Sequence, residues 1–128
     1  MKKKAVLVFA SVVLFGSWAW AGYQQHVFVG VYKSQRQAYG ELGTARNSPN
    51  SIEYIACFII WDGTTKYAQC QARDGSGTYA TCLSTSAAFV QVAASVQGDS
   101  MIVFNWDANG DCTYISVENG SDNDPKQP

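Results

Sequence analysis

The sequence predicts an α+β fold, in which an antiparallel β-sheet of five or six strands packs with one short helix. Three observations support this class. Apolar and polar residues alternate over short stretches, turn residues recur at intervals of about ten positions, and a single segment has the spacing of an amphipathic helix. An all-β sandwich or a small barrel has the same strand and turn spacing, so these stay as alternatives.

The first 21 residues have the three parts of a secretory signal peptide. Lys2–Lys4 are positive, Ala5–Phe15 is apolar, and Ala19-Trp20-Ala21 supplies small residues for cleavage. The apolar part is much shorter than the roughly twenty residues that span a bilayer. We therefore expect residues 1–21 to be removed. Residues 22–128 should then form a single disulfide-stapled β-rich domain that is secreted or periplasmic, with no membrane span after cleavage.

The charge of the predicted mature chain excludes one class of partner. The leader holds three of the nine basic residues, which leaves six against ten acidic residues and a formal net charge of −4. The predicted mature chain is mildly acidic and its cations are scattered, so it lacks a basic patch that would attract nucleic acids or anionic membranes. We expect no nucleic-acid partner, and the sequence indicates no cofactor.

The first half of the mature chain predicts two strands around an irregular segment. Valines alternate along Gln25–Tyr32, which indicates the first strand. Lys33–Asn50 is polar and without period, and its length suggests a hidden short strand or a functional loop. Glu53–Trp61 is β-branched and aromatic on both faces, so we expect a central strand that is buried on both sides.

Two further strands follow, each after a turn that begins with aspartate. Thr65–Arg73 comes after the Asp62 turn and separates its faces cleanly, and Thr78–Leu83 comes after the Asp74 turn. The face of Thr65–Arg73 predicted to be buried carries Ala68, Cys70 and Ala72.

A helix and a hairpin complete the predicted fold. Ser84-Thr85-Ser86 offers an N-cap for a helix over Ala87–Val96, although the valines of this segment weakly favour a strand. The apolar stripe of this helix would carry Phe89, Val92, Ala93 and Val96. Met101–Trp106 and Cys112–Glu118 should form a hairpin around Asn109-Gly110, and the tail from about residue 119 is expected to be frayed.

The four cysteines, Cys57, Cys70, Cys82 and Cys112, predict two disulfides. Their spacing lacks the closely paired ligands of a zinc knuckle, and export favours oxidation. The expected registers place Cys70 directly opposite both Cys57 and Cys82, so the register alone does not fix the pairing. We prefer Cys57–Cys70 with Cys82–Cys112, and Cys70–Cys82 with Cys57–Cys112 stays open.

The sequence offers one weak candidate for a metal site. Asp107, Asn109 and Asp111 have the alternate spacing of the first ligands in a calcium loop. The glycine at position 110 and the distant Glu118 do not fit that loop. A hairpin turn in which Asn109-Gly110 takes positive φ angles explains the same residues, so we expect no metal.

Catalytic residues are not indicated. His26 is the only histidine, and no nucleophile in a recognisable motif surrounds it. A pair of carboxylates for glycoside chemistry would have to come from Glu41, Glu53, Asp62 and Asp74, of which most lie in expected turns.

Aromatic residues in or beside the strands are a better indication of function. Trp61 and Trp106 each precede an aspartate-led turn, and Tyr67 and Tyr79 lie in strands. Aromatic side chains beside polar turns suit binding of a protein or a sugar, although they equally suit the second face of a sheet. Arg46, outside any expected core face, completes the candidate binding surface.

Four segments of the chain resemble a group of small secreted four-cysteine bacterial proteins of unassigned function. The segments are Gly43–Ser48, Tyr54–Cys57, Gln69–Asp74 and Asp99–Thr113. The resemblance covers most of the mature chain from about Gly43. It implies a bacterial source and the four cysteines as a set, and it implies no activity and no site residues.

These observations together favour an exported, non-enzymatic binding or interaction protein, such as an inhibitor or a surface module for an unknown protein or carbohydrate ligand. A small secreted hydrolase is one alternative. A second alternative is an envelope structural protein that self-associates through exposed strand edges.

Overall fold

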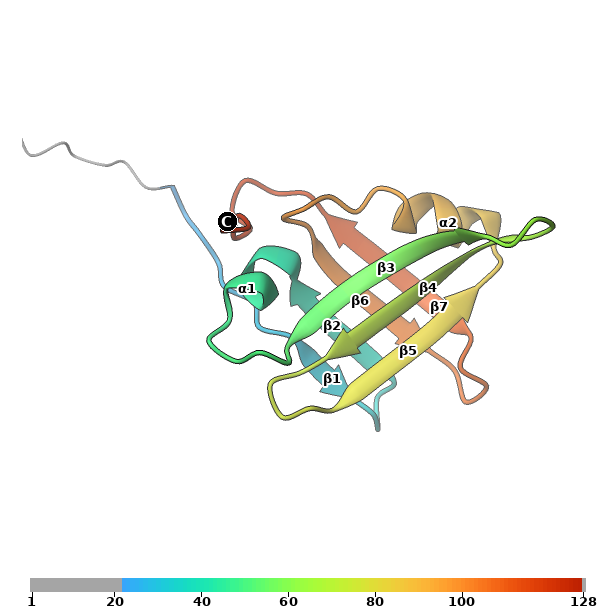
Figure 1. Ribbon diagram of the computed structural model, residues 1–128, viewed down its shortest axis with the longest axis horizontal. Helices are drawn as coiled ribbons and strands as arrows, with labels where there is room; N and C mark the ends of the chain where they lie inside the picture. Colours follow the sequence, from blue (N-terminus) through green and yellow to red (C-terminus); the bar gives the residue numbers. More distant parts are fainter. Residues whose placement is uncertain (1–21, 128) are drawn as a thin grey trace, which may run out of the picture.

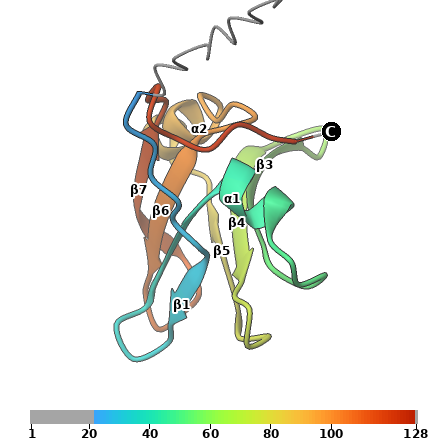
Figure 2. The same ribbon diagram turned by 90° about the vertical axis from the view of Figure 1, so that its left-hand side faces the viewer.

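The computed structural model describes residues 22–127, and the predicted signal peptide lies outside them. Within this range, seven strands form two antiparallel sheets that face each other as two layers (Figures 1 and 2), accompanied by two short helices. The predicted α+β fold class with antiparallel sheets is confirmed. The strands are divided between two sheets and number seven rather than five or six, and there are two helices rather than one.

The two sheets differ in the number and order of their strands. The four-stranded sheet has the order β1-β2-β6-β7, and the three-stranded sheet has the order β3-β4-β5. The four-stranded sheet comprises β1 (Gly30–Tyr32), β2 (Gln37–Glu41), β6 (Met101–Trp106) and β7 (Cys112–Glu118). The three-stranded sheet comprises β3 (Tyr54–Trp61), β4 (Lys66–Arg73) and β5 (Tyr79–Ser84). The helices are α1 (Leu42–Asn47) and α2 (Ala87–Ala93).

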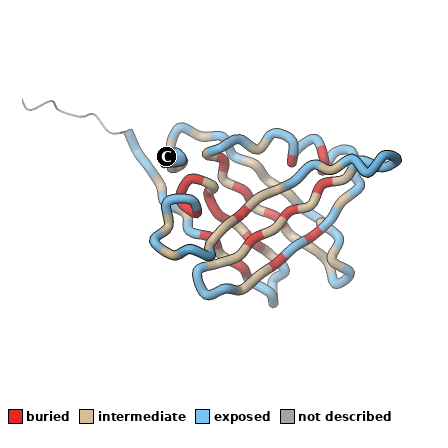
Figure 3. Tube along the Cα trace, viewed as in Figure 1, coloured by how far each residue is buried: buried red, intermediate tan, exposed pale blue. Residues whose placement is uncertain are grey.

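The core lies between the sheets. Buried and half-buried residues alternate along β4, as the sequence predicts (Figure 3). Apolar side chains from both sheets and from α2 fill this layer, and burying them supplies the main driving force for folding. The core includes Val31, Ala38, Ile102 and Phe104 of the four-stranded sheet, Ile55, Ala68, Cys70, Ala72, Ala80 and Cys82 of the three-stranded sheet, and Phe89, Val90 and Ala93 of α2.

The prediction that Glu53–Trp61 forms a central strand buried on both sides is wrong. Within residues 22–127, β3 is an edge strand that pairs with β4 alone, and Phe58 and Trp61 are 46% and 63% exposed. β-branched and aromatic residues indicate a strand but do not say how many neighbours it has. Here the chain before β3 belongs to the other sheet, so no strand is left to cover this edge.

The irregular segment after the first strand contains β2, as one of the predicted possibilities, and also the unpredicted α1. The first strand is shorter than expected, because β1 begins only at Gly30. Before it, the backbone N–H of Val27 donates to Glu41 Oε2 at 3.2 Å, and that of Val29 donates to Glu53 Oε1 at 2.6 Å. Two carboxylates thus accept the N–H groups of this segment, while the Glu41 backbone N–H donates to the Val27 carbonyl at 3.0 Å.

The predicted helix forms with the predicted cap. The Ser86 hydroxyl accepts a hydrogen bond from the Phe89 backbone N–H at 3.4 Å. The helix ends at Ala93, and its buried face carries Val90, whereas Val92, which was expected on the buried stripe, is 38% exposed. Packing of α2 against both sheets decides which valine is covered.

Two disulfides hold the fold, and they match the pairing that we prefer from the sequence. Cys57–Cys70 joins directly opposite residues of β3 and β4, whereas Cys82–Cys112 joins β5 to the first residue of β7 and so links the two sheets. Two disulfides are typical of oxidising compartments outside the cytoplasm. From residue 22 to residue 127, no helix combines the length and apolar character that a bilayer crossing requires.

The tail that was expected to be frayed packs against α1 in the structure. The Asn47 side chain donates to the Pro125 carbonyl at 3.0 Å and accepts from the Gln127 backbone N–H at 3.0 Å. A Cβ atom added to Gly43 would lie 1.7 Å from the Asp124 carbonyl oxygen. Only a glycine at position 43 therefore lets the tail cross the helix at this distance.

Candidate binding surface

The outer face of the three-stranded sheet is open, with no helix or strand of residues 22–127 packed over it. Because strand side chains alternate between faces, the residues between the buried ones point away from the core. Neither helix lies over this face (Figures 1 and 2). We call it the outer sheet face, and it comprises Tyr54, Ala56, Phe58 and Ile60 of β3, Tyr67, Gln69, Gln71 and Arg73 of β4, and Tyr79, Thr81 and Leu83 of β5.

Arg73 lies between two tyrosine rings on this face. Its guanidinium carbon is 5.9 Å from the ring centroid of Tyr54 and 5.6 Å from that of Tyr79. The register explains the arrangement, because Tyr54 and Tyr79 are the direct cross-strand neighbours of Arg73. Such cation–π contacts contribute about 0.5–1 kcal/mol each at exposed sites and fix the direction of the side chain.

The charge of Arg73 has no counterion among residues 22–127. The single ion pair in this part of the chain joins His26 and Asp124, and the Arg73 Nε atom is buried without an acceptor. Burial and the nearby Tyr79 raise the pKa of Tyr54, while the charge of Arg73 opposes that shift. The face therefore presents a positive group between two tyrosine rings.

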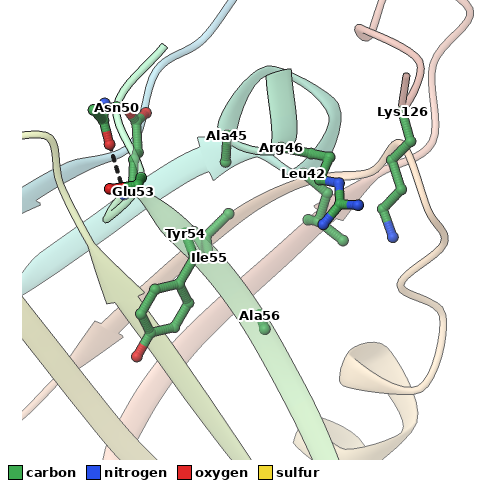
Figure 4. Close-up of a pocket in the computed structure, with 10 residues that line it drawn as sticks. Leu42, Ala45, Arg46, Asn50, Glu53, Tyr54, Ile55, Ala56 and Lys126 are labelled. Atoms are coloured by element: carbon green, nitrogen blue, oxygen red, sulfur yellow. Dashed lines mark hydrogen bonds between the residues drawn. The ribbon is translucent and has the colours of Figure 1, made fainter. Parts of the chain in front are cut away.

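The second feature is a groove of about 440 Å³ beside the first half of β3. Its walls come from α1, the loop before β3, β3 itself and the tail. Arg46 and Lys126 point into the same open space beside the strand (Figure 4). We call it the β3 groove, and it is lined by Leu42, Ala45, Arg46, Asn50, Ser51, Glu53, Tyr54, Ile55, Ala56 and Lys126.

Glu53, at one end of the β3 groove, is already fully engaged. Its Oε1 accepts from the Val29 backbone N–H, and its Oε2 accepts from Asn50 Nδ2 at 2.8 Å and from the Ser48 hydroxyl at 3.1 Å. Asn50 in turn accepts from the Glu53 backbone N–H at 2.8 Å (Figure 4). This carboxylate holds the loop before β3 and does not neutralise Arg46.

The predicted candidate surface is divided between several places. Tyr67 and Tyr79 lie on the outer sheet face, and Arg46 lines the β3 groove. Trp61, at the end of β3, lies on the same side of the strand as Ile55 and Cys57, opposite to the outer sheet face. The ring centroid of Trp106 is 5.9 Å from that of the core residue Phe104. The five residues therefore do not form one surface.

Arg73, Tyr54 and Lys126 matter for these surfaces and were not singled out from the sequence. Arg73 could have been found, because the register that brings Cys70 opposite Cys82 also places Arg73 opposite Tyr79. Lys126 had no signal, since its position depends on how the tail crosses α1.

His26 meets a carboxylate, in a cluster whose residues do not line the β3 groove. Its Nδ1 is 2.8 Å from Asp124 Oδ2, and the Thr44 hydroxyl lies 3.2 Å from the same oxygen. The Thr44 hydroxyl donates to Glu41 Oε2 at 2.7 Å, and Glu41 is completely buried. The cluster ties β2, α1 and the tail together, and Thr44 is too buried to reach a substrate.

The remaining carboxylates that we considered for catalysis stabilise their own turns. Hydrogen bonds from Thr65 and Thr64 lower the pKa of Asp62. Burial raises the pKa of Asp74, but hydrogen bonds from Ser76 and Thr78 outweigh it and lower the pKa below its usual value. Such turn aspartates do not work as paired catalytic groups.

The weak metal candidate is a hairpin turn. The carboxylate of Asp107 accepts from the backbone N–H groups of Asn109 at 2.8 Å and Asp111 at 3.0 Å. Gly110 has a φ of 86°, whereas Asn109 does not take the positive φ that we expected. No group of three or more metal-ligating side chains occurs between residues 22 and 127.

Comparison of the chain with known protein families, with curated proteins and with solved structures finds no match.

Proposed function

We propose that this protein is an exported, non-enzymatic binding protein whose outer sheet face contacts a partner protein. The observation that carries the proposal is Arg73, held between Tyr54 and Tyr79 on an uncovered face with no counterion among the described residues. Tyrosine and arginine are enriched at the energetic centres of protein interfaces. A carboxylate of a partner would supply the missing charge.

The neighbourhood of Arg73 favours a protein over a carbohydrate. Farther along the same face, Phe58 and Leu83 are 46% and 39% exposed, and Ile60 follows Phe58 on β3, opposite Tyr67. Apolar side chains offer nothing to the hydroxyl groups of a sugar, whereas they bury well against the apolar centre of a protein interface. The Cys57–Cys70 disulfide and the strand ladder hold the face rigid, which lowers the entropy cost of binding.

Site-specific crosslinking tests the proposal. A photoreactive residue at Thr81, exposed on the outer sheet face, should crosslink a partner protein in the envelope or medium of the producing organism. The same residue at Tyr114, which is 51% exposed on the other sheet, should not. Arg73→Gln should abolish the Thr81 crosslink while the melting temperature changes little.

Equal crosslinking from both positions, or a crosslink indifferent to Arg73→Gln, would contradict a protein partner on this face. Binding of the exported protein to immobilised glycans that is lost in Arg73→Gln would replace the protein partner by a carbohydrate. Export itself is tested by intact mass, which should place the mature N-terminus at Gly22.

A further inference from the structure

β3 has a free edge along its whole length. It pairs with β4 on one side, and no residue from 22 to 127 forms a backbone hydrogen bond with it on the other side. Its eight residues contain no proline and no charge, and its register with β4 has no bulge. Natural edge strands usually carry one of these protections, and a partner strand can pair with an edge that lacks them.

The register identifies the backbone groups that face the free edge. Cys57 and Cys70 are directly opposite with a Cα–Cα distance of 4.1 Å, the narrow spacing of a pair that is not hydrogen-bonded to each other. The Asp62 N–H donates to the Thr65 carbonyl, so these two residues are a hydrogen-bonded pair. Asp62 lies an odd number of residues after Cys57, and the two kinds of pair alternate, which agrees with Cys57 and Cys70 being a pair without hydrogen bonds. The N–H and C=O groups of Ile55, Cys57 and Ile59 therefore point away from β4.

The β3 groove runs along the first half of this edge. Its floor beside Ile55 and Ala56 is apolar, because Leu42 and Ala45 of α1 face the strand. Beyond the floor, Arg46 points into the open space (Figure 4). A segment that pairs with β3 would thus lie between the strand and α1.

Two cations stand on the wall of the β3 groove without a counterion. Neither Arg46 nor Lys126 forms an ion pair with any residue between 22 and 127. α1 places both residues beside the groove, because Arg46 belongs to α1 and the neighbouring Asn47 holds the backbone of the tail that carries Lys126. Both residues are exposed, and their side chains point into the same open space (Figure 4).

We propose that the β3 groove binds an extended, acidic peptide segment of another protein, which adds to β3 as a further strand. Backbone hydrogen bonds to Ile55 and Cys57 would supply affinity, and alternate side chains would supply specificity. The side chains directed toward α1 would be an apolar residue over Leu42 and Ala45 and a carboxylate between Arg46 and Lys126. This site shares Tyr54 and Ala56 with the outer sheet face, but it rests on the free edge of β3 and on Arg46 and Lys126, so it does not depend on the function proposed for that face.

The charges favour another protein over a second copy of this chain. Pairing of β3 with β3 would bring together two strands that contain no acidic residue. The nearest carboxylate, Glu53, already accepts hydrogen bonds from Val29, Ser48 and Asn50. Self-association would leave the cations of both copies without a counterion, whereas an acidic peptide would neutralise them.

A displayed library of heptapeptides, selected on the exported protein, tests the proposal. We expect enrichment of extended sequences with Asp or Glu at alternate positions. The affinity of an enriched peptide should fall at least tenfold in Arg46→Glu/Lys126→Glu, measured by fluorescence anisotropy at low salt, and the loss should shrink at high salt. Lys33→Glu, a charge reversal in the turn after β1, is the matched control and should leave the affinity unchanged.

A second measurement follows the backbone. Peptide binding should shift the amide NMR signals of Ile55 and Cys57 and protect them from hydrogen exchange, and N-methylation of alternate peptide amides should abolish binding. Arg73→Gln on the outer sheet face should leave peptide affinity intact, which separates this site from the proposed function.

Three results would overturn the proposal. They are the absence of any enriched acidic sequence, enriched peptides that bind Arg46→Glu/Lys126→Glu as well as the wild type, and concentration-dependent dimerisation that protects the β3 amides without peptide. The last result would assign the edge to a second copy of the chain.

Discussion

The outer faces of the two sheets both carry tyrosines, yet their polar groups are arranged differently. On the four-stranded sheet, the rings of Tyr32 and Tyr39 stack at 5.7 Å with their hydroxyls 3.2 Å apart. Next to them, the Gln37 amide donates to Asn105 at 3.5 Å. On the three-stranded sheet, Tyr54 and Tyr79 enclose Arg73, whose charge meets no acid in the described part of the chain.

Aromatic content alone does not identify a binding face. On the four-stranded sheet, Tyr32 pairs with Tyr39 and Gln37 pairs with Asn105, so these polar groups already have partners. The three-stranded sheet leaves a rigid charge and exposed apolar side chains, which an acidic, partly apolar partner would cover. The two disulfides also differ in role. Cys57–Cys70 stiffens the three-stranded sheet, whereas Cys82–Cys112 attaches it to the four-stranded sheet.

The largest expected effect comes from the disulfide that joins the sheets. Cys82→Ala/Cys112→Ala should lower the free energy of unfolding by about 4 kcal/mol, and Cys57→Ala/Cys70→Ala by about 3 kcal/mol, because the sequence separations are 30 and 13. Scanning calorimetry should show melting temperatures lower by more than about 10 °C in both variants. A larger loss from the bridge within the three-stranded sheet would contradict the chain-entropy account of their difference.

The next effect concerns the tail, which packs on α1 and leaves the outer sheet face uncovered. Gly43→Ala should cost about 1–3 kcal/mol, because its Cβ would collide with the Asp124 carbonyl and the tail would have to move. Hydrogen exchange should show loss of protection at Gln25, whose N–H donates to the Asp122 carbonyl. Gly75→Ala, whose Cβ would lie 3.4 Å from the Asn50 side chain, is the control and should change little.

A smaller effect on stability sharpens the comparison of the two outer faces. A double-mutant cycle of Arg73→Gln and Tyr79→Leu should give a coupling free energy of about 0.5–1 kcal/mol. A cycle of Tyr32→Leu and Tyr39→Leu on the other sheet should give a similar coupling of about 0.5–1.5 kcal/mol. Only the first set should reduce crosslinking of a partner from position 81, and a reduction by the second set would break the distinction.

The smallest effect is the acid response of the turn between β4 and β5. The pKa of Asp74 is lowered in the folded protein, so its stabilising contribution is present above the unfolded value near 3.9 and is lost as pH falls through the folded value. Asp74→Asn should lower the free energy of unfolding by less than about 1 kcal/mol at pH 6, and the difference from wild type should be smaller at pH 2.5. Urea titrations at the two pH values measure it. A difference that persists in acid would mean that the charge of Asp74 is not what stabilises the turn.

The sequence predicts the local elements well where a side-chain pattern and a turn signal coincide. β4 with its buried alanines, the β6–β7 hairpin and the Ser86 cap all depend on neighbours within a few residues. It fails for α1, because a six-residue helix with Gly43 and Thr44 in it has weak intrinsic helix propensity. That helix exists because the tail and β3 pack against it.

Local sequence patterns were likewise enough to place only some of the candidate binding residues. Tyr79 was predicted as a binding residue, and its neighbour Arg73 follows from a register that the cysteines already suggest. Trp61 and Trp106 were grouped with it because each precedes a turn, but they belong to different sheets. A local similarity of sequence cannot say on which layer a residue lies.

Side-chain alternation and turns of a few residues are enough to predict most of the antiparallel strands, the two faces of β4 and the set of four cysteines. Long-range packing is needed to explain why β3 is an edge, why Cys82 and Cys112 join two sheets, and why Lys126 lies near Arg46. These outcomes depend on contacts between residues far apart in the chain. The order of strands in a sheet and the path of a tail are set by how the whole core packs, and no local pattern records that.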